Sequence, residues 1–181
     1  MSNESIDQPI KIRENGKLNF KNSATKFGII TGLVSIILSL VFYFTNVEYD
    51  TWSRYLSILI SMILIFIGVK SISDENANKF ISFGSLFKAG MLITLILAII
   101  SIAYFYIYTN FINSDFMDGL MQVQKEQMAD KGLSEEKIET AMEMAQKFSS
   151  PIFMTITSFI TFIVIGAISS AIGAAIYKKE K

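Results

Sequence analysis

Four long, almost uncharged stretches constrain the fold of this chain more than any other feature of its sequence. Two of them, 27–45 and 90–108, run for 19 residues without a charged side chain, and a third, 151–177, runs for 27. The fourth, 52–69, contains Arg54 as its one charged residue. A helix needs about 20 mainly apolar residues to cross a hydrocarbon layer about 30 Å thick. Because no shell of amphipathic helices surrounds these stretches to cover them in water, the sequence predicts an all-α, polytopic membrane protein with four transmembrane helices rather than a soluble bundle.

Basic residues predict the orientation of these helices. The tail 1–26, the loop 70–89 and residues 178–181 carry five, three and three of the 16 Lys and Arg residues. The loop 109–150 carries four, against eight Asp and Glu residues. Because Lys and Arg near a membrane stay cytoplasmic, we expect both termini in the cytoplasm and the loop 109–150 outside it. The tail lacks the cleavage site of a secretory signal, so we expect a retained, disordered cytoplasmic segment followed by one transmembrane domain, 27–181.

The loop 109–150 contains a charged, methionine-rich segment that begins with "MADKGLSEEKIETAMEMAQKF" at Met128. Apolar residues recur at helical spacing on both sides of Gly132, Ser134 is suited to cap the second helix, and Pro151 ends it. These signals predict an extracytoplasmic amphipathic helical hairpin over 114–149, between the third and fourth crossings. Its apolar stripes pack against each other, lie on the membrane, or bind a partner. The candidate partner-binding residues are Met117, Met121, Met128, Ile138, Met142 and Phe148.

Small residues recur at four-residue spacing in all four crossings. In lipid, such residues let helices approach closely, and packing then replaces the hydrophobic drive. We therefore predict a compact bundle, with close packing at Gly28, Gly32, Gly90, Gly166, Ser170 and Gly173. The alternative interpretation is a hydroxyl-lined pathway, for which the candidate residues are Thr31, Ser35, Thr94 and Ser169.

The residue types present give little support for catalysis. The chain contains no cysteine and no histidine, which removes thiolate nucleophiles, histidine acid–base chemistry and the usual zinc sites. Methionine thioethers in the loop 109–150 suit Cu(I), but methionine equally fills helix interfaces and no dense repeat of methionine pairs occurs. We therefore expect no enzymatic activity, no cofactor and no metal site. The formal net charge of zero predicts no nucleic-acid partner.

Two segments carry a resemblance to a known family. They are "ISFGSLFKAGMLITLIL" from Ile81 and "NFINSDFMDGLMQVQKEQMADKGLSEEKIETAMEMAQKFSSP" from Asn110. The chain resembles, from about Ser23 onward, a family of small bacterial membrane proteins known as domain of unknown function 4199. The Ser82-Phe83-Gly84 and Asp115-Phe116 motifs are its most specific parts. The resemblance implies four crossings in a bacterial inner membrane, and it implies no catalytic residue or ligand.

Two hypotheses for the function follow. The first is a non-enzymatic inner-membrane protein that uses the hairpin to recognise another membrane or envelope protein, or a second copy of itself. The second is a small transporter or oligomeric pore for an uncharged or lipophilic solute, with a path along the hydroxyl-bearing residues named above.

Overall fold

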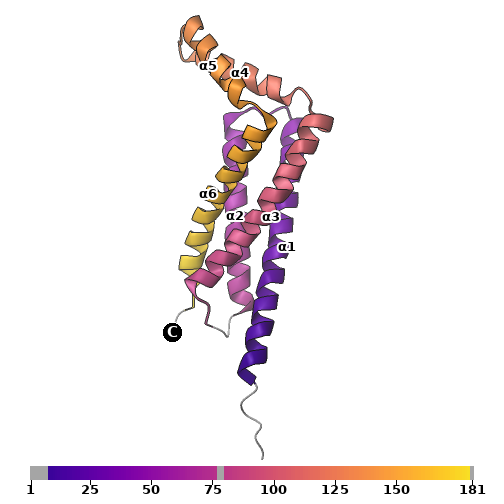
Figure 1. The fold of residues 1–181 in the computed structure, drawn as a ribbon, viewed down its shortest axis with the longest axis vertical. Helices are drawn as coiled ribbons and strands as arrows, with labels where there is room; N and C mark the ends of the chain where they lie inside the picture. Colours follow the sequence, from indigo (N-terminus) through magenta and orange to yellow (C-terminus); the bar gives the residue numbers. More distant parts are fainter. Residues whose placement is uncertain (1–7, 77–79, 180–181) are drawn as a thin grey trace, which may run out of the picture.

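The computed structural model describes residues 8–76 and 80–179, and this part of the chain is almost entirely helical. Figure 1 shows the long helices side by side, with shorter helices across one end of them. The long helices are α1 (Gln8–Phe44), α2 (Thr51–Glu75), α3 (Phe83–Ile107) and α6 (Pro151–Tyr177). The shorter pair is α4 (Phe116–Asp130) and α5 (Glu135–Phe148). A π-helical turn, η1 (Tyr108–Ile112), follows α3 and precedes α4. We call the two ends of the bundle the α4–α5 end and the Tyr177 end.

Within the described part of the chain, four helices are long and apolar enough to cross a membrane, over residues 21–44, 51–75, 83–112 and 152–177. Their outward faces are apolar as well as their inward faces. Along α6 an exposed aliphatic residue recurs at every fourth position: Ile152, Ile156, Ile160, Val164, Ile168, Ile172 and Ile176. A continuous apolar face of this length would be costly in water and is favourable in hydrocarbon, so the fold is that of a helical membrane protein.

The helices extend beyond the apolar stretches of the sequence. α1 begins at Gln8 rather than near Phe27, so the described part of the expected disordered tail is helical, while residues 1–7 lie outside the described residues. α3 begins at Phe83 rather than near Gly90 because Ser82 caps it, accepting a hydrogen bond from the Ser85 backbone N–H. Once a helix has formed, each added residue contributes one further hydrogen bond. The helices therefore continue from the apolar stretches into the polar residues that flank them.

The core of the bundle lies toward the Tyr177 end, where glycines bring the helices together. Gly90 of α3 lies against Ser170 of α6, and Gly166 of α6 lies against Thr94 of α3. On the other side of α3, a Cβ at Gly28 of α1 would lie 2.7 Å from Ile96 Cβ. Apolar side chains fill the space between these contacts, and the fully buried ones are Ile65, Val69, Ile72, Leu86, Ile93 and Leu97.

Hydrogen bonds between distant segments close the Tyr177 end. Ser73 Oγ donates to the Tyr177 carbonyl oxygen at 2.7 Å, and Lys179 Nζ donates to the Ser73 carbonyl oxygen at 2.8 Å. Ile81 and Lys179 exchange two backbone N–H···O bonds of 3.0 Å each, which form an isolated β-bridge. The segment before α3 and the segment after α6 are therefore held beside the end of α2.

Candidate functional site

A cavity of about 590 Å³ lies among the four crossing helices near the α4–α5 end. Its walls come from residues 35–42 of α1, 53–65 of α2, 97–108 of α3 and η1, and 154–165 of α6. None of these four segments contains a glycine, whereas the opposite halves of the same helices contain Gly28, Gly32, Gly68, Gly90, Gly166 and Gly173. The helices therefore meet closely at the Tyr177 end, and larger side chains hold their backbones apart around the cavity.

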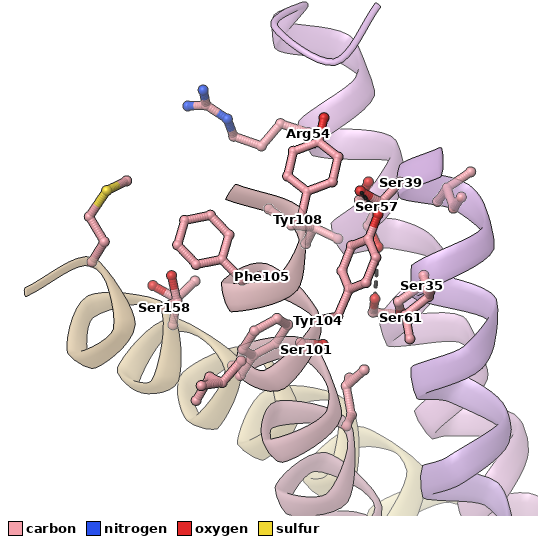
Figure 2. Close-up of a pocket in the computed structure, with 18 of the residues that line it drawn as sticks. Ser35, Ser39, Arg54, Ser57, Ser61, Ser101, Tyr104, Phe105, Tyr108 and Ser158 are labelled. Carbon is pink, nitrogen blue, oxygen red and sulfur yellow. Dashed lines mark hydrogen bonds between the residues drawn. The ribbon is translucent and has the colours of Figure 1, made fainter. Parts of the chain in front are cut away.

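Hydroxyl groups from several helices face this cavity (Figure 2). Ser35 Oγ donates to the Thr31 carbonyl oxygen at 2.9 Å, Ser57 to that of Ser53 at 3.0 Å, and Ser61 to that of Ser57 at 2.9 Å. Because these hydroxyl protons are used within the helices, the oxygen lone pairs remain as hydrogen-bond acceptors. The remaining wall is mostly apolar and includes Ile36, Leu38, Ile58, Leu97, Phe105 and Phe162.

The cavity is closed toward the Tyr177 end. Ile65 and Leu97 line its deepest part, and each is 1% exposed. Val69 and Ile93, which are fully buried, pack in the core beyond them. The arrangement is a chamber in one half of the bundle that ends at these side chains and is open along α6, where Thr157, Ser158 and Thr161 of its lining are exposed.

The first turns of α4 cover the other end of the chamber, where Phe116, Leu120 and Gln124 line it. Aromatic contacts hold Phe116 in place: its ring stacks on Tyr49 at 5.6 Å and meets Tyr108 edge-on at 5.3 Å. Gly119 allows the Tyr49 hydroxyl to contact the α4 backbone, because a side chain there would occupy the same space. These contacts make α4 a roof on the chamber.

Glu48 lies beside this roof, in the connection between α1 and α2. Asn113 Nδ2 donates to Glu48 Oε1 at 3.0 Å and to the Tyr108 hydroxyl at 3.3 Å. Glu48 Oε2 is buried, and within the described residues it has no hydrogen-bond partner. Burial raises the pKa of Glu48 above its ordinary value, and the hydrogen bond from Asn113 offsets only part of this rise.

A second, smaller cavity of about 260 Å³ adjoins the chamber under the middle of α4. It shares Arg54, Leu120 and Gln124 with the chamber. The rest of its lining is mainly polar or basic: Tyr49, Thr51, Val123, Gln127, Met128 and Lys131. Arg54 therefore stands at the junction of an apolar and a polar space.

The residues proposed from sequence for helix packing lie at helix contacts. Gly28 and Gly32 face Ile96 and Ile100 on α3, and Gly173 of α6 faces Val69 on α2. Gly90, Gly166 and Ser170 form the α3–α6 contacts described above.

The structure brings together only part of the proposed hydroxyl pathway. Ser35 lines the chamber. Thr31, Thr94 and Ser169 are 1%, 0% and 3% exposed, and none lies in the lining of the chamber. Their hydroxyls donate to carbonyl oxygens of their own helices, those of Phe27, Gly90 and Ile165. The pathway hypothesis missed other hydroxyl-bearing residues that line the chamber, among them Ser39, Ser57, Ser61, Ser101 and Ser158. Ser39, Ser57, Ser61 and Ser101 also follow the small-residue spacing of their helices, and that spacing does not separate a packed face from a cavity wall.

The proposed partner-binding residues of the α4–α5 pair differ in their exposure. Ile138 is buried at 7% exposure, and Met117, Met121, Met128 and Met142 are half-buried. Phe148 is 56% exposed, and its ring lies 4.9 Å from that of Phe153 at the start of α6. Gly132, in the connection between the two helices, has a φ of +75°, which favours glycine.

Comparison with known proteins gives one match. A family model described as "Protein of unknown function (DUF4199)" matches residues 26–179. No curated protein and no solved structure matches the chain.

Proposed function

We propose that this chain, which belongs to the DUF4199 family of proteins of unknown function, is a multi-pass membrane protein. In this proposal it binds a small lipophilic molecule in the chamber beneath α4. The chamber itself carries the proposal. Its volume of about 590 Å³ lies within the range of ligand sites, and a mainly apolar wall with a few convergent polar groups is the usual composition of such sites.

We assign the chamber to binding rather than to catalysis. The chain has no histidine or cysteine to act as a base or thiolate. Ser35, Ser57 and Ser61 direct their protons to helix carbonyls, which is not the arrangement of an activated nucleophile. Because Ile65 and Leu97 close the chamber, we also favour a binding site over an open pore.

The proposed location is a bacterial inner membrane, with both termini in the cytoplasm and the α4–α5 pair outside it. The distribution of Lys and Arg residues supports this orientation. Trp52, Tyr55 and Tyr106 are 52%, 67% and 65% exposed near the α4–α5 end, as expected of aromatic residues at the membrane–water interface. In this orientation the chamber lies in the outer half of the membrane and its ligand enters from that side.

Labelling with a photoactivatable long-chain alcohol tests the binding proposal, because the probe is lipophilic and uncharged. Ser101→Phe places a ring in the chamber, whereas Ile99→Phe places the same ring on a surface of α3 that is 58% exposed. We expect labelling of the wild-type full chain within residues 97–108 or 154–165. Ser101→Phe should reduce it about tenfold or more, and Ile99→Phe should leave it unchanged. Equal labelling of all three proteins would contradict the proposal.

A second proposal concerns the α4–α5 pair, as a recognition surface for another envelope protein. It is supported by Met144, 58% exposed, and by Phe148, 56% exposed, on α5. Met144→Glu should remove co-purifying envelope proteins from the full chain, while Gln146→Glu on the same helix should not. An unchanged set of partners with Met144→Glu would count against this second role.

A further inference from the structure

We infer that the ligand is a membrane lipid with an anionic headgroup, whose acyl chain occupies the chamber and whose headgroup occupies the smaller cavity at Arg54 and Lys131. This inference rests on the proposed binding function and adds the chemical class of the ligand.

Continuity between the two cavities is the first argument. Arg54, Leu120 and Gln124 line both, so the spaces meet under α4. The larger space is walled mainly by aliphatic and aromatic side chains, and the smaller one mainly by polar or basic side chains. A molecule that fills both must have an apolar part and a polar part, which is the composition of a lipid.

The charge of the smaller cavity is the second argument. Arg54 and Lys131 line it together with the side-chain amides of Gln124 and Gln127, and no carboxylate occurs among the described residues of its lining. The guanidinium group presents several N–H donors in a planar fork that matches a phosphate or carboxylate. The nearby Asp50 carboxylate accepts a hydrogen bond from Trp52 Nε1 at 2.9 Å. Glu48, next in sequence to Tyr49 of the smaller cavity, lines the chamber instead and accepts a hydrogen bond from Asn113. The smaller cavity therefore favours an anion.

The position of the cavity along the membrane normal is the third argument. Arg54 lies in the first turn of α2 between Trp52 and Tyr55, which are 52% and 67% exposed. Exposed Trp and Tyr side chains mark the depth of the lipid headgroups. Arg54 is therefore at the level where a lipid phosphate lies, and the chamber extends from there into the depth of the acyl chains. This geometry favours a membrane lipid over a free anion.

Retention of two lipids with identical acyl chains tests the inference. The full chain, purified in a neutral detergent, is mixed with phosphatidylglycerol or phosphatidylcholine, and bound lipid is measured by native mass spectrometry. We expect the wild type to retain phosphatidylglycerol about tenfold better, since each charge-assisted hydrogen bond contributes on this scale. Arg54→Gln with Lys131→Gln should remove the preference and leave phosphatidylcholine retention unchanged.

Matched variants keep the test specific and independent of folding. Lys125→Gln with Lys137→Gln removes the same charge from α4 and α5 outside the smaller cavity, and it should preserve the preference. Arg54→Lys with Lys131→Arg keeps both charges and should retain most of it. Ser101→Phe should lower retention of both lipids, because it blocks the chamber that the acyl chain needs.

Three results would overturn the inference. Equal retention of the two lipids by the wild type, with labelling by the long-chain alcohol intact, would remove the headgroup assignment and leave the binding chamber. Loss of the preference in the Lys125→Gln, Lys137→Gln control would indicate general surface charge instead of a site. Displacement of phosphatidylglycerol by millimolar glycerol phosphate would indicate a free-anion site. Absence of alcohol labelling would instead contradict the proposed function.

Discussion

Gly166 of α6 lies against Thr94 of α3, and four residues away on the same two helices Gly90 lies against Ser170. Each helix thus contributes one small residue and one hydroxyl-bearing residue to the contact. Ser170 Oγ is buried without a conventional hydrogen-bond partner within the described residues, and it faces the Cα of Gly90. Close approaches of this kind, where glycine brings helices together, are the sites at which Cα–H···O contacts recur.

Gly166→Ala should destabilise the bundle, because the new methyl group would overlap the Thr94 side chain. Overpacking of this kind costs about 1–3 kcal/mol, which lowers the thermal unfolding midpoint in detergent. Thr94→Ala in the same chain should recover part of the loss. Gly84→Ala is the control, because among the described residues no atom beyond its chain neighbours and its own helix backbone lies within 4 Å of its Cβ position. Equal midpoints for the Gly166 and Gly84 variants would show that the α3–α6 contact is loose.

Glu48 gives the protein a pH-dependent stability. Its folded-state pKa is raised by burial above the ordinary value of 4.5, so the folded state favours the protonated form. This contribution is fully present below pH 4.5 and is lost as pH rises through the folded-state pKa. Glu48→Gln keeps an acceptor for Asn113 and cannot ionise. Its stability relative to wild type should therefore increase as the pH rises from below 4.5 through the raised folded-state pKa of Glu48.

Thermal unfolding of both proteins across that range measures the difference. Glu139→Gln, an exposed substitution on α5, serves as the control. A constant offset between Glu48→Gln and wild type would contradict a raised pKa.

At this scale the sequence indicates which residues are small, but not what each of them faces. Thr94 and Ser101 lie on one helix and both belong to a small-residue face, yet Thr94 packs against Gly166 and Ser101 lines the chamber. The difference depends on what the neighbouring helix presents at the same depth. That depth follows from helix register and tilt, which hydrophobic periodicity does not specify.

At the scale of elements, the lengths of the apolar stretches predict the crossing helices, because hydrocarbon thickness sets the length that a helix needs. Turn residues also have local effects: Gly132 adopts a positive φ, and Pro151 begins α6. Ser134 takes the N-cap position of α5, but its side chain accepts no hydrogen bond there. The sequence does not predict that α4 covers a chamber, since this depends on Tyr49 and Phe116 meeting across 67 residues of chain.

Gly119→Leu should detach the α4 roof, because its side chain would occupy the position of the Tyr49 ring. We expect faster trypsin cleavage at Lys125 and Lys131, by about fivefold for each ~1 kcal/mol of lost contact energy. Ala129→Leu adds the same side chain at an exposed position of α4 and should leave the rate unchanged. Identical cleavage rates for the two variants would mean that Tyr49 does not hold the roof.

At the scale of the whole molecule, the two ends of the bundle have different construction. Glycine contacts and the hydrogen bonds of Ser73 and Lys179 close the Tyr177 end. At the α4–α5 end the helix segments contain no glycine, and the chamber lies between them. Because the chamber lies at one end of the bundle, a lipid bound in it would come from one leaflet only. Orientation in the membrane therefore decides which leaflet supplies the ligand.

Single-cysteine labelling measures that orientation, because the natural chain contains no cysteine. Lys131→Cys places a thiol in the connection between α4 and α5, and Lys178→Cys places one just after α6. In intact spheroplasts a membrane-impermeant maleimide should label the first variant, and it should label the second only after permeabilisation. The reason is that Lys and Arg residues concentrate in the segments on the Lys178 side. Labelling of Lys178→Cys alone would place the α4–α5 end in the cytoplasm, and the chamber would then receive its lipid from the inner leaflet.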